Sequence, residues 1–235
     1  MRSIIKTLFS FILMGALLTS VSCSKEPEKE TIEENYIEIN GIKVAKGNLI
    51  SNGMNGAKIG KPTDGGLYFQ FGSLIGWSET GDNPTIVAKP IGYTGSTTWS
   101  KNWKGSPSNE NVALGTGDPC KHYLGRTWRL PTKEECKTII NEANNSTSWQ
   151  AIEGWSWRSS PAGMLHHSGL FFPAFGYRSG SNGHLSLVGS DSYYWSASPS
   201  GDSNGYGLFA NSDFVSPHDN NIRSDGFTIR CVRDK

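Results

Sequence analysis

Residues 193–232 read YYWSASPSGDSNGYGLFANSDFVSPHDNNIRSDGFTIRCV. Taken two residues at a time around Leu208, this stretch alternates in the way expected of extended chain with one buried face. The buried side is predicted to be fixed by Trp195, Tyr206, Leu208, Val215, Phe227, Ile229 and Val232. We therefore expect strands from this stretch to organise the fold.

The other side of these strands carries a mixture of aromatic, aliphatic and small polar residues. Antibody paratopes use a similar mixture, because rings give contact area at low entropy cost and small polar groups adapt. We therefore predict a ligand-binding face on this side. Tyr206 is assigned both to the buried side and to the ligand-binding face. Its residues are Asp202, Asn204, Tyr206, Phe209, Asn211, Asp213, Phe214, Ser216, His218, Asp219, Asn220, Ile222 and Asp225.

Several spaced motifs carry a family resemblance. The C-terminal motifs are Y-W-S-x-S-P, Y-x-L, S-x-x-V-x-P and N-N-x-R-S-x-G-F-x-x-R-C-V, and W-R-L-P-T-x-x-E (128–135) and LFFPAFGYRSG (170–180) precede them. Together they resemble proteins with the Fibrobacter succinogenes major paralogous domain. The C-terminal part resembles, more narrowly, the variable region of targets of diversity-generating retroelements.

The resemblance implies an α+β, C-type-lectin-like fold, shared with formylglycine-generating enzymes, in which an N-terminal strand lies beside the C-terminal strand. In the retroelement targets, asparagine codons are replaced by codons for other residues. The resemblance thus implies a ligand face that tolerates variation. Residues that fit this origin are Gly207, Phe209, Phe214, Ser216, Asp219, Ile222 and Asp225.

Residues 1–22 are predicted to be a signal peptide. Arg2 and Lys6 precede an apolar run, Thr7 to Leu18, that is short for a membrane span. The following L-L-T-S-V-S-C resembles a bacterial lipoprotein signal, with Cys23 as the lipidated residue and Ser20 in place of the usual leucine. An ordinary cleaved secretory signal is the alternative.

Residues 23–35 are charged, contain Pro27 and lack an apolar run, so they are predicted to be a solvated acidic tether. Acidic residues after the lipidated cysteine also resemble the export signal of Bacteroidetes surface lipoproteins, and a simple spacer is the alternative. We expect a lipid anchor in the outer membrane, facing the cell exterior, followed by a single domain at 36–235.

Composition limits the possible partners. Without Arg2 and Lys6, 20 basic and 21 acidic residues remain, a net charge of −1. No basic field exists to attract nucleic acid. With 28 glycines and 11% aromatic residues, the chain is expected to be loop-rich with an aromatic core.

Two local structures are well specified by their sequence. YIEINGIKVAKGNLI (36–50) predicts a hairpin, with Asn40-Gly41 as its turn. A helix over residues 132–143 is predicted because Thr132 and Glu135 form a capping box. Cys136, Ile139, Ile140 and Ala143 share its apolar face.

Aromatic residues punctuate the long loop-like region 53–117. LYFQFGSLIGW (67–77) is predicted to be a strand feeding the core, and LFFPAFGYR (170–178) a short buried strand with a bulge or edge at Pro173. Trp99 and Trp103 fit either sugar stacking or, preferentially, clamping of loops to the body.

Arginines and cysteines are expected to be structural. Arg129, Arg178, Arg223 and Arg230 suit fork-shaped hydrogen bonds to loop carbonyls or carboxylates better than anion binding. Cys120, Cys136 and Cys231 allow one disulfide and one free thiol. Pairing of Cys136 with Cys120 and pairing of Cys136 with Cys231 are both open.

No motif in the sequence specifies catalysis, a cofactor or a metal. Histidines 122, 166, 167, 184 and 218 lack metal-ligand spacing, and the oxygen-rich SGDSNG and HDNN segments lack calcium-loop spacing. We therefore expect a non-enzymatic surface lipoprotein that binds a protein or glycan. The alternatives are a structural, fimbria-associated adhesion component and, less favoured, a formylglycine-generating-enzyme-like envelope enzyme.

Overall fold

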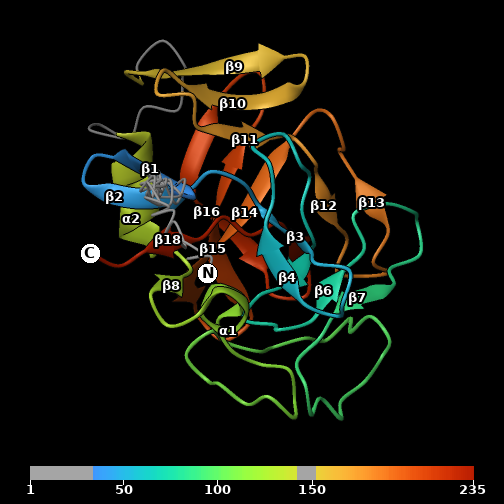
Figure 1. Cartoon of the computed structure of the whole chain (residues 1–235). Coiled ribbons are helices and arrows are strands. Elements are labelled where there is room, and N and C mark those ends of the chain that lie inside the picture. The colour runs from blue at the N-terminus through green and yellow to red at the C-terminus, as the bar shows by residue number, and fades with distance from the viewer. Residues whose placement is uncertain (1–33, 142–151) are drawn as a thin grey trace, which may run out of the picture. The chain divides into compact units, whose positions relative to one another are not determined.

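Short antiparallel strands make up most of the regular structure in the residues that this computed structural model describes, 34–141 and 152–235 (Figure 1). The strands before residue 130 are β1 (Tyr36–Ile39), β2 (Ile42–Ala45), β3 (Leu49–Ser51), β4 (Ala57–Ile59), β5 (Phe69–Gln70), β6 (Gly76–Trp77), β7 (Ile86–Ala88) and β8 (Trp128–Arg129). Those that follow are β9 (Trp155–Ser159), β10 (Ala162–His166), β11 (Phe171–Pro173), β12 (Tyr177–Arg178), β13 (Leu185–Ser186), β14 (Ser192–Ser200), β15 (Asn204–Ala210), β16 (Val215–Ile222), β17 (Gly226–Phe227) and β18 (Val232–Arg233).

The class expected from the sequence, α+β and C-type-lectin-like, is wrong for this structure. The described residues contain two short helices, α1 (Pro119–Leu124) and α2 (Lys133–Ile140), and otherwise small antiparallel strands in several separate sheets. In this part of the chain no helix is long and apolar enough to cross a membrane. Glycines and long loops interrupt the strands too often for an extended sheet to form, so packing between small sheets replaces it.

Strands from both ends of the described chain lie in one sheet, ordered β1-β2-β18-β8. Asn40 and Gly41 take left-handed φ angles of 50° and 80°, as the two-residue turn of the β1–β2 hairpin requires. Val44 of β2 pairs with Val232 of β18, which confirms the expected closure of the N-terminal strands on the C-terminal strand. The predicted hairpin is confirmed, whereas the signal peptide, Cys23 and tether residues up to 33 lie outside the described residues.

The capping box predicted for the main helix is present. The Thr132 hydroxyl accepts the N–H of Glu135, and the Glu135 carboxylate accepts the N–H of Thr132. The helix α2 ends earlier than expected, because Asn141 adopts the left-handed conformation as its C-cap. Cys136, Ile139 and Ile140 are buried as predicted; Ala143 lies outside the described residues.

Two predicted strands are each broken into two. A turn at Gly72, with φ of 64°, separates β5 from β6 within residues 67–77. Gly176, with φ of 61°, separates β11 from β12 within residues 170–178. A Cβ at Gly176 would lie 1.9 Å from the carbonyl oxygen of Ser186, so only glycine fits there. Pro173 ends β11, an edge strand of the sheet β11-β10-β9, which agrees with its predicted edge position.

Four arginines act as internal hydrogen-bond donors, which confirms their predicted structural role. Arg178 and Arg223 donate to loop carbonyls, including those of Ser78 and Gly201, and Arg129 forms a two-pronged pair with Glu135. Arg230, buried among backbone oxygens, is described below. In a loop-rich chain with few strand-to-strand hydrogen bonds, these arginine side chains supply hydrogen bonds that hold the loops together.

Cys120 forms a disulfide with Cys231, across a sequence separation of 111. Neither of the two pairings considered from the sequence is present, since both involved Cys136. Cys136 faces the core from α2 and is a buried free thiol. Burial raises the pKa of the Cys136 thiol to about 12, so it is unreactive.

Candidate functional site

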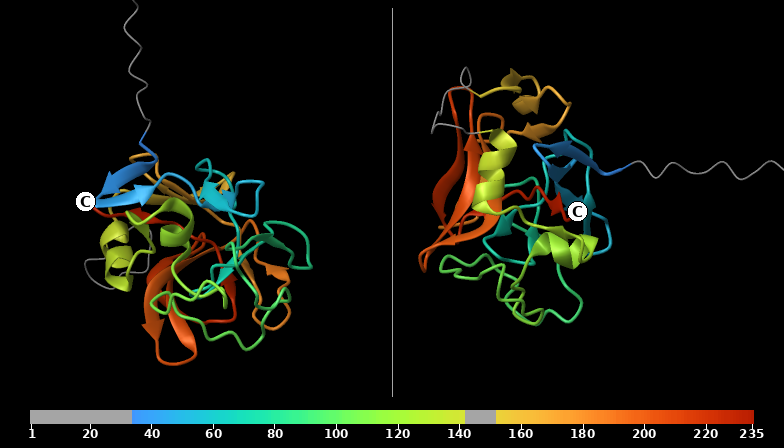
Figure 2. Two further views of the ribbon diagram at one scale, coloured as in Figure 1. Left: turned by 60° about the horizontal axis from the view of Figure 1, so that its bottom comes forward. Right: turned by 90° about the vertical axis from the view of Figure 1, so that its left-hand side faces the viewer.

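The predicted ligand-binding residues lie on or beside the sheet β14-β15-β16. Its first face packs under α2: Tyr194, Leu208, Ala210 and Val215 share a buried cluster with Ile139 and Ile140. Figure 2 shows α2 running alongside these orange and red strands. We call this side the α2 face. Leu208 and Val215 are 3% and 0% exposed, as predicted for the scaffold side.

The opposite face of the sheet is also covered, over β14 and β15. Trp195 stacks on Phe227 with ring centroids 4.0 Å apart, and Phe71 packs edge-on against Trp195 at 5.2 Å. A Cβ at Gly205 would lie 2.3 Å from the Phe71 ring, so this close approach requires glycine. These two strands are therefore central, with a core on each side.

The edge strand β16 is different. From Ser216 to Ile222 only Pro217 is buried, whereas most of β15 is buried. The pairing of β15 with β16 shifts register between Gly207 and Phe209, where Pro217 has no N–H to donate. The bulge and the proline interrupt the ladder with β15, and such irregularities make an edge strand a poorer template for pairing with other strands.

The predicted binding residues do not share one face, which corrects the prediction of a single display side. Tyr206 pairs with Asn220, and Asn204 pairs with Ile222, so these side chains project on the α2 face. Phe209 pairs with Ser216 on the opposite face, where Asp219 also projects. The bulge changes the alternation along β16, an effect that a strict period of two cannot predict.

Phe209 is a core residue rather than a ligand contact. It is 8% exposed, and its ring centroid lies 4.8 Å from that of Tyr193 and 5.2 Å from that of Phe214. Phe214 in turn is 37% exposed, and Ile222 at the far end of β16 is 49% exposed. The buried Phe209 ring thus packs against Phe214, and of these two rings it is Phe214 that is accessible at the surface.

Several polar members of the predicted set have structural roles. The Asn211 Oδ1 atom accepts the N–H groups of Asp213 and Phe214 and shapes the β15–β16 turn. The Asp225 carboxylate accepts the N–H of Gly180 at 2.7 Å. Asp219 accepts from Asn221, and His218 is half-buried. The carbonyl of Asn204 accepts from Arg223. The members that remain at the surface with no described side-chain role in the fold are Asp202, Ser216, Asn220 and Ile222.

Asp225 should make stability depend on pH. Burial raises the pKa of its carboxyl to about 6, above the unfolded value of 3.8. The folded state therefore holds this proton more tightly, so stability from Asp225 is greatest below pH 4 and falls as the pH rises to 6. Since part of the group is exposed, we expect Asp225→Asn to be more stabilising at pH 7 than at pH 4 by about 1 kcal/mol.

This difference can be measured by urea unfolding of the variant and the wild type at both pH values. Asp202→Asn, in the exposed β14–β15 turn, is the matched control and should show no such difference. A pH-independent effect of Asp225→Asn would contradict the assignment.

Next to this segment lies a cavity of about 360 Å³ that the sequence did not predict as a site. Its walls come from β5, β6 and the loops 93–105 and 114–116. Gln70, in one wall, donates to the carbonyl of Ser224, and Arg223 donates to the carbonyls of Lys104 and Gly105. The C-terminal segment thus holds the cavity in place. Only the cluster of aromatic residues between 68 and 103 indicated its location in advance.

Trp99 and Trp103 both clamp loops, which confirms the preferred prediction for them. The Trp99 Nε1–H donates to the carbonyl of Gly180, and the Trp103 Nε1–H donates to the carbonyl of Phe71. Their environments differ, because Trp103 also lines the cavity, whereas Trp99 packs edge-on against Trp77.

No group of three or more His, Cys, Asp or Glu residues that could hold a metal ion is found in the residues 34–141 and 152–235. The Cys120–Cys231 disulfide is buried, with both residues at most 1% exposed. These sulfurs therefore have no access to a substrate.

Residues 167–232 match the model of a family described as a domain of unknown function (DUF8237). The match begins before β11 and includes the whole sheet β14-β15-β16 and the start of β18. A search of curated proteins found no match. A search of solved structures also found no match.

Proposed function

We propose that this protein is a non-enzymatic binding module that recognises a protein partner through the edge strand β16 and the adjoining turns. The observation that carries the proposal is the contrast between neighbouring strands: β15 is mostly buried, whereas from Ser216 to Ile222 only Pro217 of β16 is buried and Asn220 and Ile222 are exposed. A sheet held on both faces by packed cores gives these side chains a rigid base.

Its chemistry favours a protein surface as the ligand. Phe214 and Ile222 are large apolar side chains exposed at opposite ends of β16, with small polar groups between them. Phe214 packs on Phe209 on one face of the sheet and Ile222 projects on the α2 face, so a partner that contacts both would wrap around the edge strand. At about 3.4 Å per residue, the strand separates them by a distance within the width of an ordinary protein interface. Apolar anchors surrounded by adaptable polar groups are typical of protein interfaces.

The charge of this surface suggests the chemistry of its partner. Asp202, Asp213 and Asp219 lie on or beside β16. Of the nearby cations, Arg223 is buried and engaged with carbonyls, and Lys133 lies over the ring of Tyr206. We expect the partner to carry basic residues here, and the association rate to fall with salt.

The export prediction fits this function. A buried disulfide is typical of proteins that fold outside the cytoplasm, so it supports export of the chain. The proposed lipid anchor at Cys23, facing the cell exterior, rests on the signal motif. The resemblance to targets of diversity-generating retroelements supports a surface built to tolerate substitution. The exposed residues of β16 meet that requirement because the described core does not use them.

Substitutions at exposed positions should separate binding from folding. We expect Ser216→Ala, Asn220→Ala and Ile222→Ala each to change the free energy of unfolding by less than about 0.5 kcal/mol. Leu208→Ala, one strand away and 3% exposed, should cost about 2 kcal/mol or more. Urea unfolding of the four variants measures this contrast.

Binding can be tested with an immobilised chain that begins at Ser24, exposed in parallel to solubilised cell-envelope proteins and to a glycan array. Phe214→Ser and Ile222→Asp should each reduce capture of a protein partner at least tenfold while the melting temperature is retained. Capture that both variants leave unchanged would refute the assigned surface. Binding confined to the glycan array would reassign the ligand class, and no binding in either format would favour a structural component.

A further inference from the structure

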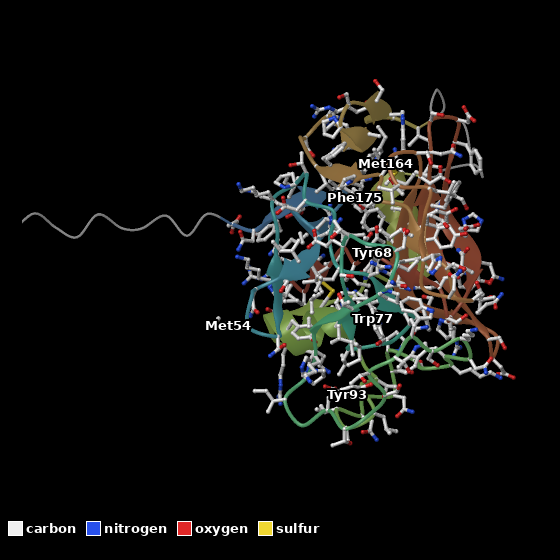
Figure 3. All side chains as sticks on the ribbon, turned by 90° about the vertical axis from the view of Figure 1, so that its right-hand side faces the viewer. Met54, Tyr68, Trp77, Tyr93, Met164 and Phe175 are labelled. Atoms are coloured by element: carbon white, nitrogen blue, oxygen red, sulfur yellow. A yellow bond between two sulfur atoms is a disulfide. The ribbon has the colours of Figure 1, made fainter. Side chains whose placement is uncertain are left out.

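The cavity beside β5 and β6 has the features of a prebuilt ligand site. Its volume of about 360 Å³ lies within the range of about 300–1,000 Å³ typical of small-molecule pockets. Trp77, Tyr93 and Trp103 give it aromatic walls, and Ser73, Asn102 and Thr116 add polar groups. Figure 3 shows Trp77 and Tyr93 on the side of the molecule that bears the long loops.

Hydrogen bonds fix the walls of this cavity without a ligand. The Gln70 side-chain amide donates to the carbonyls of Ser100 and Ser224 at 2.7 and 2.8 Å. The Tyr93 hydroxyl donates to the carbonyl of Ser96, and the Trp103 indole to that of Phe71. A ligand would therefore meet rings that are already oriented, so little conformational entropy is lost on binding.

Two buried polar atoms of lining residues have no hydrogen-bond partner in the described part of the chain. They are the indole Nε1 of Trp77, a residue 2% exposed, and the hydroxyl of Thr116, a residue 9% exposed. Buried polar groups are nearly always satisfied, so two unsatisfied groups on residues that line one cavity favour a polar occupant. Neither atom is exposed to the cavity, so small side-chain movements would bring them into reach of that occupant. Trp77 can only donate, whereas Thr116 can donate and accept.

The lining selects a class of ligand. Among the described residues that form the cavity, Lys104 is the only charged one, and it is exposed. A strongly anionic or cationic ligand would therefore lack a buried counter-charge. Aromatic rings and neutral hydroxyl and amide groups together match a molecule with apolar C–H faces and many hydroxyls.

We infer that this cavity binds the terminal ring of a neutral saccharide. The ring lies against the aromatic walls, and its hydroxyls satisfy Trp77 Nε1 and Thr116 Oγ1 after small side-chain adjustments. The inference goes beyond the protein-binding surface of β16 and does not depend on it. Because the two sites use different residues, each can fail without the other.

The test uses saturation-transfer NMR and calorimetry on the full chain with Cys23→Ser, which removes the lipidation site. The probes are the methyl glycosides of glucose, galactose, mannose and N-acetylglucosamine. We expect at least one to bind. Thr116→Val and Trp77→Phe each delete one unpartnered polar atom and should raise its dissociation constant about tenfold.

Thr116→Val should keep the wild-type melting temperature or exceed it, because the deleted hydroxyl has no partner in the folded chain. Trp77→Phe also removes part of a buried ring that packs on Trp99, so it should lower the melting temperature while the chain stays folded. Thr98→Trp, at an exposed lining position, should block the cavity and abolish binding. Ile222→Asp is the matched control and should bind the same glycoside normally.

The inference is overturned if none of the four glycosides binds the folded wild type. It is also overturned if a glycoside binds equally well to Thr116→Val, Trp77→Phe and Thr98→Trp, because the sugar would then lie elsewhere. Loss of binding in Ile222→Asp with normal binding in the cavity variants would place sugar recognition on β16 instead.

Discussion

Replacing Cys120 and Cys231 together by alanine is expected to lower the free energy of unfolding by about 4 kcal/mol, because closure of a loop of this length restricts the unfolded chain strongly. The bond spans a sequence separation of 111 and joins α1 to the residue before β18. Alanine is preferred to serine here, since both positions are buried and a hydroxyl would lack a partner.

Reduction provides the matched measurement. Urea unfolding with and without dithiothreitol should show a large loss of stability in the wild type and none in the double variant. Cys136→Ala should remain as sensitive to the reductant as the wild type, because its thiol is free. A wild type that is indifferent to dithiothreitol, or a peptide map that places Cys136 in the bond, would contradict the pairing.

Arg230→Ala is expected to cost about 4 kcal/mol, because it leaves several buried acceptors without a donor. The guanidinium donates to Asn48 Oδ1 and to the carbonyls of Ala45, Lys46 and Phe171 at 2.8–3.0 Å. It also lies over the ring of Phe172, 4.5 Å from the centroid. One side chain thus links the N-terminal strands, β11 and the C-terminal segment.

Arg230→Lys should recover little of this loss. An ammonium group is a compact charge that cannot reach the acceptors arranged around a planar fork. Arg126→Ala, at an exposed position, is the control and should be close to neutral. Thermal and urea unfolding of the three variants test the assignment, and a cost below about 1 kcal/mol for Arg230→Ala would show that water or backbone shifts replace the donor.

Features set by neighbours in the sequence were predictable. The Asn40-Gly41 turn and the Thr132–Glu135 capping box depend on residues no more than three apart, so their energetics do not need the rest of the chain. The burial of Leu208 and Val215 also followed from alternation. Gly72 and Gly176 interrupt two apolar runs that were predicted to be single strands. Both residues adopt positive φ angles in turns, and the alternation of apolar and polar residues does not predict such turns.

The candidate binding surface was predictable only in part. Alternation identifies one buried face of a strand, but β14 and β15 are buried on both faces by segments far away in the sequence. Phe209 was therefore assigned to the ligand and lies in the core. The bulge at Pro217 then divided the remaining residues between the two faces. The part of the candidate binding surface that remains is the edge strand β16. Its edge position follows only from the order of strands in the sheet.

The sequence by itself determined the local turns, the helix start, the arginines as donors and the core side of Leu208 and Val215. The tertiary structure alone decided the pairing of Cys120 with Cys231, the burial of Phe209 and the cavity at Trp77 and Thr116. The physical reason is distance along the chain: turns and caps are stabilised by adjacent residues. Disulfides, two-sided burial and cavities arise from segments that meet only after the chain has folded.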